Sequence, residues 1–392
     1  MATLKTKILG IDFENPFILA SAPPTAKIES IDKAFSLGWG GAVFKTITPD
    51  NLEMIEASPR YAVWKNGNKV CGFENIELLS HLTVQQWLDG SKFLRQKHPT
   101  KVQIASIMAP VVKEEWQKLV KTFNDSEIDA FELNFSCPHG MPEKGIGMAI
   151  GTSSEISAMI TEWVMEVAKK PVFAKLSPNV TDIAKIVGAV EKAGISGFAA
   201  INTVQSLMGI DLDTFEPKPN VNGKTTFGGY SGISVKPIGL RCVAQVRQNS
   251  DLPVLGIGGI ANWQDAAEYM CVGADAVEVC TEVMLNGYAV IEKMKQGLLN
   301  YLEGKEFAGP ADLKNKAIAN LSTHRELNKQ KQVYPHVDDS LCAKCGKCVT
   351  ICNESEHSSL SLVDGHIVVN KEACVGCSLC SHICAKSAIT MK

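Results

Sequence analysis

Short apolar segments alternate with longer amphipathic segments along most of the chain. The apolar segments have strand length and are rich in β-branched residues, which is typical of buried strands. Residues 155–170, 182–194 and 262–273 instead repeat their apolar positions with the period of a helix. Alternation of this kind predicts a parallel sheet with helices packed on it. The strands that we expect are residues 16–22, 41–46, 102–108, 129–136, 172–177, 197–203, 253–259 and 276–283.

These strand–helix units predict an α/β fold of the closed (β/α)8 barrel class, a TIM barrel. A doubly wound open sheet is the alternative, but it normally carries a glycine-rich phosphate loop after its first strand. Residues 21–30 follow the first strand here and contain no glycine. We expect the barrel over residues 1–305, a linker over 306–335 and a small separate domain over 336–392.

Composition limits the possible functions. A chain of 392 residues, 45% of them hydrophobic, can bury one large core and a small additional domain. A net charge of −3 gives no indication of a nucleic acid or an anionic membrane as partner. No apolar run reaches the roughly 18 residues of a spanning helix, and the N-terminus lacks the pattern of a signal peptide. We therefore expect a soluble protein of the reducing cytoplasm.

A four-cysteine pattern occurs twice near the end of the chain. Each copy reads Cys-x-x-Cys-x-x-Cys-x-x-x-Cys, the spacing of ferredoxins with two 4Fe–4S clusters. In such domains three closely spaced cysteines bind one cluster and the remote fourth binds the other. The expected ligand sets are Cys342, Cys345, Cys348 with Cys384, and Cys374, Cys377, Cys380 with Cys352.

Zinc and disulfides are the alternatives for these cysteines. Zinc would use two pairs and leave the remaining cysteines without a role, and disulfides need an oxidising compartment. Proline usually follows the fourth cysteine of a ferredoxin, whereas Asn353 and Ala385 stand there in this chain. The other cysteines are scattered thiols: Cys71, Cys137, Cys242, Cys271 and Cys280.

Polar residues stand at the carboxyl ends of most expected strands, where barrels of this type carry their catalytic groups. They are Ser21, Lys45, Asn134, Ser136, Cys137, Lys175, Asn202, Thr203, Gly258, Gly259, Cys280 and Thr281.

Lys45 and Lys175 are informative because a buried ammonium group requires an anionic partner. A reduced, anionic flavin would provide one. Residues 256–259 and 280–281 end the last two strands, where these barrels commonly bind phosphate. A tight turn that needs small residues is the other interpretation of the glycines. Taken together, these signals favour a flavin phosphate.

Two expected loops, residues 137–154 and 204–232, are much longer than the ordinary connection of roughly 2–6 residues. Loops of this size commonly close over a ligand. Cys137 opens the first loop. A lone cysteine is most often a small buried apolar residue, but at this place it could donate a proton or act as a nucleophile.

Several segments resemble the dihydropyrimidine dehydrogenases, a group within the class-1 dihydroorotate dehydrogenase superfamily. The resemblance covers essentially the whole chain and extends to the pyrimidine-reducing FMN/iron–sulfur subunit of the bacterial NAD-dependent enzyme. His139 stands where class-1 dihydroorotate enzymes have asparagine, and those enzymes have no fused ferredoxin. Both differences favour the interpretation that the chain resembles a dihydropyrimidine dehydrogenase. The segments are 44–46, 73–80, 131–140, 173–183, 201–210, 225–232 and the cysteine-rich tail.

The resemblance implies a role for each matching residue. Cys137 would be the general acid that protonates carbon five of uracil or thymine, while the reduced flavin delivers hydride to carbon six. Asn75, Asn134, Asn202 and Thr203 would bind the pyrimidine, with support from Glu77 and Ser136, and His139 would influence loop closure. Capping of the next helix is the alternative for Asn75. The FMN contacts would be Ser21, Lys45, Thr46, Lys175, Gly232, Ile257, Gly258, Gly259, Cys280 and Thr281.

The chain contains no Gly-x-Gly-x-x-Gly unit between a strand and a helix for a nicotinamide cofactor. We therefore expect a partner subunit that carries FAD and the NAD(P)H site. Electrons would pass from this subunit through the two clusters to FMN. The expected assembly is a hetero-oligomer that binds neither nucleic acid nor a membrane. Two alternatives remain. A class-1-like dihydroorotate dehydrogenase would need a cationic or amide contact for the substrate carboxylate, and a non-catalytic electron carrier would bind no pyrimidine.

Overall fold

The structure, a computed structural model, describes residues 2–52, 55–135, 148–330 and 332–392. The chain forms two compact units, Met1–Asn320 and Leu321–Lys392, which are described separately. The first part of the expected linker, residues 306–320, belongs to the first unit. Its contacts include a hydrogen bond of 3.0 Å from the Ala317 amide to the Cys271 carbonyl and an ion pair of 2.5 Å between Lys314 and Asp275.

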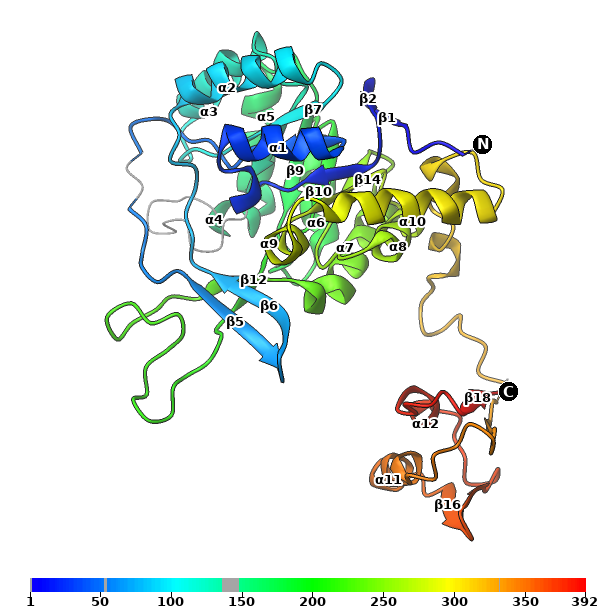
Figure 1. Cartoon of the computed structure of the whole chain (residues 1–392). Coiled ribbons are helices and arrows are strands. Elements are labelled where there is room, and N and C mark those ends of the chain that lie inside the picture. Colours follow the sequence, from blue (N-terminus) through cyan, green and yellow to red (C-terminus); the bar gives the residue numbers. More distant parts are fainter. Residues whose placement is uncertain (1, 53–54, 136–147, 331) are drawn as a thin grey trace. The chain divides into compact units, whose positions relative to one another are not determined.

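The first unit is a closed barrel of parallel strands, as the sequence predicted (Figure 1). Its last strand pairs with its first, Val277 opposite Phe17, so the sheet has no open edge. The strands follow one another around the barrel in chain order: β3 (Phe17–Leu19), β4 (Gly41–Val43), β7 (Val102–Ile107), β8 (Ala130–Asn134), β9 (Val172–Leu176), β10 (Gly197–Ala200), β13 (Val254–Ile257) and β14 (Ala276–Val279).

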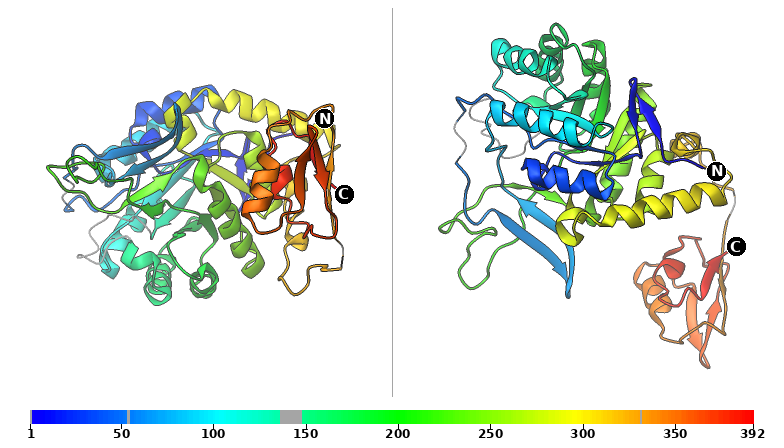
Figure 2. Two further views of the ribbon diagram at one scale, coloured as in Figure 1. Left: turned by 90° about the horizontal axis from the view of Figure 1, so that it is seen from below. Right: turned by 45° about the horizontal axis from the view of Figure 1, so that its top comes forward.

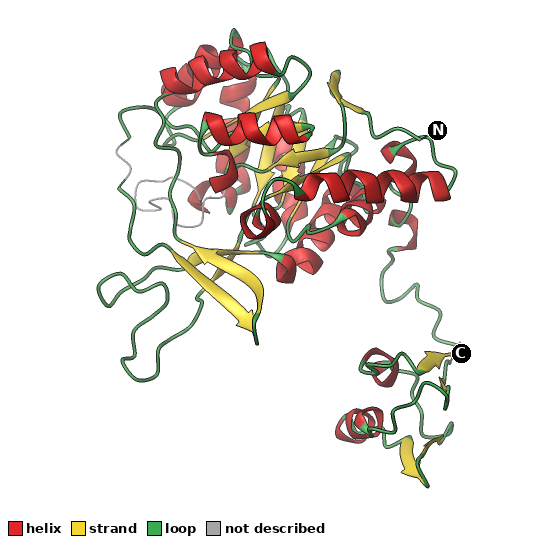
Figure 3. Cartoon of the chain, viewed as in Figure 1, coloured by secondary structure: helices red, strands yellow, loops and turns green. Residues whose placement is uncertain are grey.

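Helices surround the barrel (Figures 2 and 3). Several begin at a side-chain cap: Thr83, Ser153 and Asp182 accept hydrogen bonds from the first-turn amides of α2, α5 and α6. Helix α5 ends at Met165, earlier than the expected end at residue 170. The helices are α1 (Ile28–Leu37), α2 (Val84–Lys97), α3 (Lys113–Asn124), α4 (Met148–Gly151), α5 (Ser154–Met165), α6 (Ile183–Lys192), α7 (Lys236–Asn249), α8 (Trp263–Cys271), α9 (Thr281–Asn286) and α10 (Val290–Gly304). Short 3-10 turns lie at Pro23–Thr25, Ile233–Val235, Pro310–Leu313 and Ile318–Asn320.

Among the described residues, no helix is long and apolar enough to cross a membrane.

The amino-terminal end of the barrel is filled by apolar side chains. The hairpin of β1 (Thr6–Ile8) and β2 (Ile11–Phe13) adds Ile8 and Phe13 to the same buried cluster as Phe173 of β9. Functional groups in such barrels collect at the opposite, carboxyl-terminal end. This packing therefore leaves the carboxyl-terminal end of the barrel as the place for a site. The strand ends that the sequence analysis identified lie at this end.

A second sheet, in the order β11–β12–β6–β5, accompanies the barrel. The sequence analysis treated residues 204–232 as a loop, but the segment begins with β11 (Val204–Ser206) and ends with β12 (Gly228–Ser231). These strands are short, and β12 contains two glycines, so their strand signal is weak. A Cβ atom at Gly228 would lie 2.6 Å from Glu74 Cγ, so the pairing requires glycine there. The remaining strands are β5 (Tyr61–Asn66) and β6 (Lys69–Asn75).

The second unit is small. Two-stranded sheets pair β15 (Pro335–Val337) with β18 (Ile389–Met391) and β16 (Leu360–Val363) with β17 (His366–Val369). The helices are α11 (Lys347–Glu354) and α12 (Leu379–His382). The buried cluster consists of Cys348, Cys352, Leu360, Cys380 and Ile389. A core of this size rarely supports a fold without metal or covalent links, which fits a domain built around clusters.

Candidate active site

A cavity of about 440 Å³ lies at the carboxyl ends of the barrel strands. This volume is in the range of roughly 300–1,000 Å³ that small-molecule sites occupy. Ser136, Cys137 and His139 lie outside the described residues. The other candidate residues all line this one cavity: Ser21, Lys45, Thr46, Asn75, Glu77, Asn134, Lys175, Asn202, Thr203, Gly232, Ile257, Gly258, Gly259, Cys280 and Thr281.

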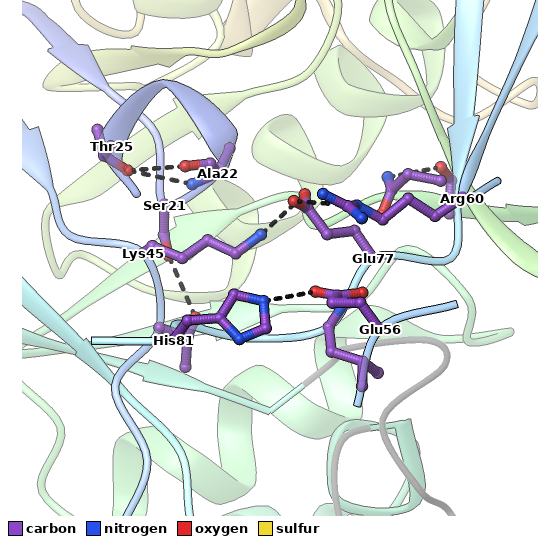
Figure 4. A network of polar contacts seen from close by, with 12 residues as sticks. Ser21, Ala22, Thr25, Lys45, Glu56, Arg60, Glu77 and His81 are labelled. Carbon is purple, nitrogen blue, oxygen red and sulfur yellow. Dashed lines mark hydrogen bonds and ion pairs between the residues drawn. The ribbon is translucent and has the colours of Figure 1, made fainter. Parts of the chain in front are cut away.

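Lys45, at the end of β4, is held by Glu77 (Figure 4). Its Nζ atom lies 2.9 Å from Glu77 Oε2, and the two side chains are only 9% and 13% exposed. The Tyr61 hydroxyl donates to the same carboxylate oxygen at 2.7 Å, and Arg60 Nε lies 3.7 Å from the other oxygen. Burial, followed by the hydrogen bond to Glu77, raises the pKa of Tyr61, so this hydroxyl remains a donor. Glu77 therefore has cationic and hydroxyl partners within the protein.

Lys175, on β9, is held between two carboxyl groups. Its Nζ atom lies 3.2 Å from Glu132 Oε1 on β8 and 3.3 Å from Glu278 Oε2 on β14, and all three side chains are buried. Burial lowers the pKa of Lys175, but the two carboxylates outweigh it, and the pKa rises above its ordinary value. The ammonium group is therefore permanently charged.

These ion pairs correct one step of the sequence analysis. That step offered a reduced, anionic flavin as the anionic partner that the buried ammonium groups of Lys45 and Lys175 need. The need for an anionic partner is met within the chain, because Glu77, Glu132 and Glu278 provide the counter-charges. The case for a flavin therefore depends on the cavity and on the family, not on unbalanced lysines.

A chain of polar side chains crosses the cavity floor. Asn134 Nδ2 donates to Thr46 Oγ1 at 2.9 Å, and Asn202 Nδ2 donates to Asn134 Oδ1 at 3.3 Å. Thr46 also contacts the hydroxyls of Ser21 at 3.2 Å and Ser106 at 3.0 Å. The strands β4, β7, β8 and β10 thus fix the orientation of the two amide groups. Such a chain can present donors and acceptors to a planar ligand.

Asn75 is the last residue of β6, and its side chain donates to the Gly229 carbonyl at 3.1 Å. The alternative that it caps the next helix was wrong, since Thr83 caps α2. The pairing of β6 with β12 carries Asn75 to the cavity from the second sheet. Strand-end reasoning could not find it, because β6 is not a barrel strand.

Among the polar groups that the sequence analysis missed, three lie on barrel strands: Ser106, Glu132 and Glu278. Each stands inside a predicted barrel strand and not at its end. A signal was nevertheless present, because a charged residue at an inward-facing position of an apolar strand must be paired. Glu132 and Glu278 follow Ala130 and Ala276, two interior residues, by two positions.

Comparison with known proteins places this site in a family. The model of the dihydroorotate dehydrogenase family matches residues 3–302, and that of a 4Fe-4S dicluster domain matches residues 335–391. The chain belongs to the dihydroorotate dehydrogenase family. It is an oxidoreductase, as predicted.

Curated relatives in this family carry two kinds of name. The chain is 36% identical over 361 residues to the NAD-dependent dihydropyrimidine dehydrogenase subunit PreA of Escherichia coli, covering 91% of this chain and 87% of the relative. It is 35% identical over 341 residues to the chloroplastic dihydropyrimidine dehydrogenase (NADP(+)) of Arabidopsis thaliana, covering 84% and 80%. It is 37% identical over 317 residues to the catalytic subunit of dihydroorotate dehydrogenase B (NAD(+)) of Pyrococcus furiosus, covering 79% and 97%. The recognition of the family from sequence is confirmed.

The backbone around the cavity fits the FMN that this family suggests. Gly258 and Gly259, after the seventh barrel strand, have φ angles of +121° and +69°. A Cβ atom at Gly259 would lie 2.7 Å from the Lys236 amide nitrogen, and one at Gly232 would lie 2.8 Å from Gly72 Cα. Only glycine suits these positions, which leaves bare backbone beside the place where such barrels bind phosphate. Burial raises the pKa of the adjacent Cys280 to about 11, so its thiol is neutral.

The cysteine-rich unit also fits its expected clusters. One small cavity is lined by Cys352, Cys374, Cys377 and Cys380, the four cysteines of one expected ligand set. Backbone amides donate to three of the thiols: Lys344 to Cys342 at 3.4 Å, Ser359 to Cys352 at 3.4 Å and Ala388 to Cys384 at 3.3 Å. Hydrogen bonds to sulfur are among the contacts that set the potential of a cluster. Within the described residues, no group of His, Cys, Asp or Glu side chains is arranged to hold a single metal ion. A 4Fe–4S cluster does not need its ligands arranged around a single ion, because each of its thiolates binds a different iron atom.

Proposed function

We propose that this chain interconverts uracil or thymine and the 5,6-dihydropyrimidine, as the pyrimidine-reducing subunit of a two-component dehydrogenase. The names of the relatives from E. coli and A. thaliana support this activity, and the word subunit in one of them supports a partner. The observation that carries the proposal is the side-chain chemistry of the cavity.

The amide groups of the cavity suit a neutral pyrimidine. Asn75, Asn134 and Asn202 line it from three different strands or strand ends, and Thr203 adds a hydroxyl. A pyrimidine-dione presents alternating N–H and C=O groups around its ring, which asparagine side chains can match with their paired donor and acceptor. Hydrogen bonds already fix Asn134 and Asn202 relative to each other, so little ordering is required when the substrate binds.

The charges of the cavity argue against an anionic substrate. The basic side chains among its described lining residues are Lys45, Lys69 and Lys175. Lys45 and Lys175 are balanced by carboxylates, and Lys69 is exposed to solvent. The carboxylate of dihydroorotate would therefore compete with Glu77 for Lys45, and the cost of removing this carboxylate from water would be poorly offset. A neutral pyrimidine avoids this cost.

In the proposed reaction Cys137 donates a proton to carbon five of the ring, and the asparagines hold the ring in place. Bound FMN supplies the hydride chemistry, and the two clusters supply single electrons. The ten FMN contacts proposed are those given in the sequence analysis, from Ser21 to Thr281. The eight cysteines of the ferredoxin motif are the proposed cluster ligands. The partner would carry FAD and the NAD(P)H site.

The test is turnover by the purified full-length chain with artificial electron donors and acceptors. We expect reduction of uracil and oxidation of dihydrouracil, with little oxidation of dihydroorotate. Turnover of dihydroorotate without turnover of dihydrouracil would identify a dihydroorotate dehydrogenase. Flavin content without an absorbance change on adding either pyrimidine would identify an electron carrier.

Glu77→Gln tests the charge argument directly. The change keeps the shape of the side chain and removes the counter-charge of Lys45, which could then bind a substrate carboxylate. We expect orotate affinity to rise by roughly tenfold or more, which corresponds to about 1.4 kcal/mol of added attraction to Lys45. Glu56→Gln is the matched control, since Glu56 belongs to the same group of contacts but binds His81 at 3.4 Å and not Lys45 (Figure 4). Equal orotate binding by the parent chain and both variants would contradict the argument.

A further inference from the structure

The polar layer inside the barrel has an unusual charge balance. Glu132, Lys175 and Glu278 each stand two positions after an interior apolar residue, namely Ala130, Phe173 and Ala276. They therefore point into the barrel, directly above the apolar layer. Strands β8 and β9 are neighbours, but β14 lies three strands beyond β9, so Lys175 reaches across the interior to Glu278. Lys175 and Glu278 also line the cavity.

Two carboxyl groups share one ammonium group in this layer. If both were ionised, this buried layer would carry a net negative charge, which is costly. Glu132 Oε2 and Glu278 Oε1 are buried and accept no hydrogen bond from any donor among the described residues. A proton on either carboxyl group would remove the excess charge and would let one of these oxygens donate to the other carboxyl group.

The electrostatics agree with this geometry. Burial raises the pKa of Glu278 well above its ordinary value, the charge of Glu132 raises it further, and Lys175 only partly offsets both. A hydrogen bond between the two carboxyl groups contributes in the same direction. The next ionisable groups toward the cavity are the neutral thiol of Cys280 and the group of Lys45, Glu77 and Arg60. The thiol adds no charge, and the two cations of the second group both lie beside the carboxylate of Glu77.

We propose that Glu132, Lys175 and Glu278 form a neutral triad in which the two carboxyl groups share one proton, and that this proton sets the charge beneath the flavin site. With the proton in place, Lys175 presents its ammonium group to the cavity while the triad as a whole is uncharged. Loss of the proton adds one negative charge and disfavours an anionic, reduced flavin. The proposal concerns positioning residues of the FMN site and rests on that part of the proposed function. It does not depend on which pyrimidine reacts.

Infrared spectroscopy of the folded full-length chain detects the shared proton without any turnover. The chain used for this measurement should carry Glu74→Gln. Glu74 is another fully buried glutamate, and burial raises its pKa, so it could contribute a carboxylic acid band of its own. With glutamate labelled by ¹³C at its side-chain carboxyl group, we expect a label-sensitive carboxylic acid band at neutral pH. Adding either Glu278→Gln or Glu132→Gln should abolish it, since the remaining carboxylate then balances Lys175 alone. Absence of the band before these changes would overturn the proposal, and this measurement needs no triad variant to fold.

Flavin titration tests the effect of the proton. The FMN-depleted chain is titrated with oxidised FMN and, anaerobically, with reduced FMN between pH 6 and 9. For the parent chain we expect the preference for reduced over oxidised FMN to fall by roughly tenfold or more as the triad loses its proton, the effect of one unit charge within about 12 Å at an effective dielectric constant of about 20. Glu278→Gln should remove this part of the pH dependence. The pH dependence intrinsic to FMN is the same for every variant.

Glu74→Gln is the control for the titration. Glu74 is as buried as Glu278 and also has a carboxyl oxygen without a described partner, but it stands on β6 and does not line the cavity. Its change should leave the pH dependence of the parent chain unaltered. Curves that superimpose for the parent chain and Glu278→Gln would overturn the proposal, and so would an equal effect of Glu74→Gln. Failure to turn over uracil would bear only on the proposed function.

Discussion

Two cysteines of the barrel have different expected chemistry. Cys280 lines the cavity beside Lys175 and Lys45, whose charges favour a thiolate, yet burial outweighs them and raises its pKa to about 11. Its thiol should therefore be inert at neutral pH, because only the thiolate attacks electrophiles. Cys280 is best described as part of the cavity wall.

Alkylation measures this difference. At pH 8 the thiolate fraction of a group with a pKa of about 11 is roughly 100-fold below that of an ordinary cysteine. We expect iodoacetamide to modify Cys280 more slowly than a free cysteine peptide by at least that factor. The rate should rise with pH up to about 11. Peptide mass spectrometry after timed quenching reports the rate, and rapid modification at pH 8 would contradict the assignment.

Cys137 has the opposite expected role. If it protonates the pyrimidine, Cys137→Ala should lower turnover by roughly 100-fold or more, the usual worth of a positioned acid, with FMN and iron content unchanged. Cys137→Ser should recover part of the rate, since a hydroxyl is a weaker donor in the same place. Cys271→Ala, at the end of α8 and outside the cavity lining, is the control. Parent-like turnover by Cys137→Ala would show that the thiol only packs.

At the residue scale, sequence reasoning found groups at strand ends and missed their partners. Lys45 and Lys175 were identified because a strand end has a predictable place in a barrel. Glu77 came only from the resemblance, and Glu132 and Glu278 were overlooked. Their importance depends on which residues face each other across the barrel, and this follows from strand tilt and register, which no single strand encodes.

At the scale of elements, the turn after β13 has a conformation that the sequence also suggested. Gly259 has a φ angle of +69°, and a Cβ atom there would lie 2.7 Å from the Lys236 amide nitrogen. Gly259→Ala should therefore combine backbone strain of about 1–2 kcal/mol with displacement of the start of α7. We expect a lower melting temperature and weaker FMN retention, measured by thermal scanning and by flavin fluorescence after dialysis.

Gly188→Ala is a matched control for that turn. Gly188 lies within α6, and a Cβ atom there would have no neighbour within 4 Å. Alanine in a helix interior is favoured over glycine by about 1 kcal/mol, so this variant should be as stable as the parent chain or slightly more so. An equal loss of FMN from both variants would refute a specific role for the turn.

The barrel strands were predicted correctly because their apolar pattern in the sequence is strong. Every barrel strand lies within an expected segment, because fully buried strands are continuous apolar runs. The strands β11 and β12 were missed, since they are short and owe their stability to pairing with β6, a segment far away in the sequence. The sheet that they form nevertheless brings Asn75 and Gly232 to the cavity.

At the scale of the whole molecule, the chain combines a barrel that holds the proposed pyrimidine site with a 4Fe-4S dicluster domain. Two 4Fe–4S clusters correspond to about eight iron atoms and eight acid-labile sulfides per chain. A barrel that received hydride directly from a nicotinamide would have no need of such clusters. In the proposed function, these clusters carry electrons to or from the FMN site.

The last prediction concerns this route. The purified chain should show negligible reduction of uracil with NADH or NADPH, although it oxidises dihydrouracil with an artificial acceptor. The physical reason is that we expect no nicotinamide site in this chain, since the sequence has no Gly-x-Gly-x-x-Gly strand–helix unit and the turns at Gly232, Gly258 and Gly259 line the proposed FMN cavity. Addition of a flavoprotein that carries FAD and a nicotinamide site should restore NAD(P)H-driven turnover.

Cys380→Ala, which removes a buried expected cluster ligand, should abolish that restored activity and spare turnover with the artificial acceptor. Iron analysis checks that the cluster is lost, and rapid NADH-driven reduction of uracil by the chain alone would show that it needs no partner.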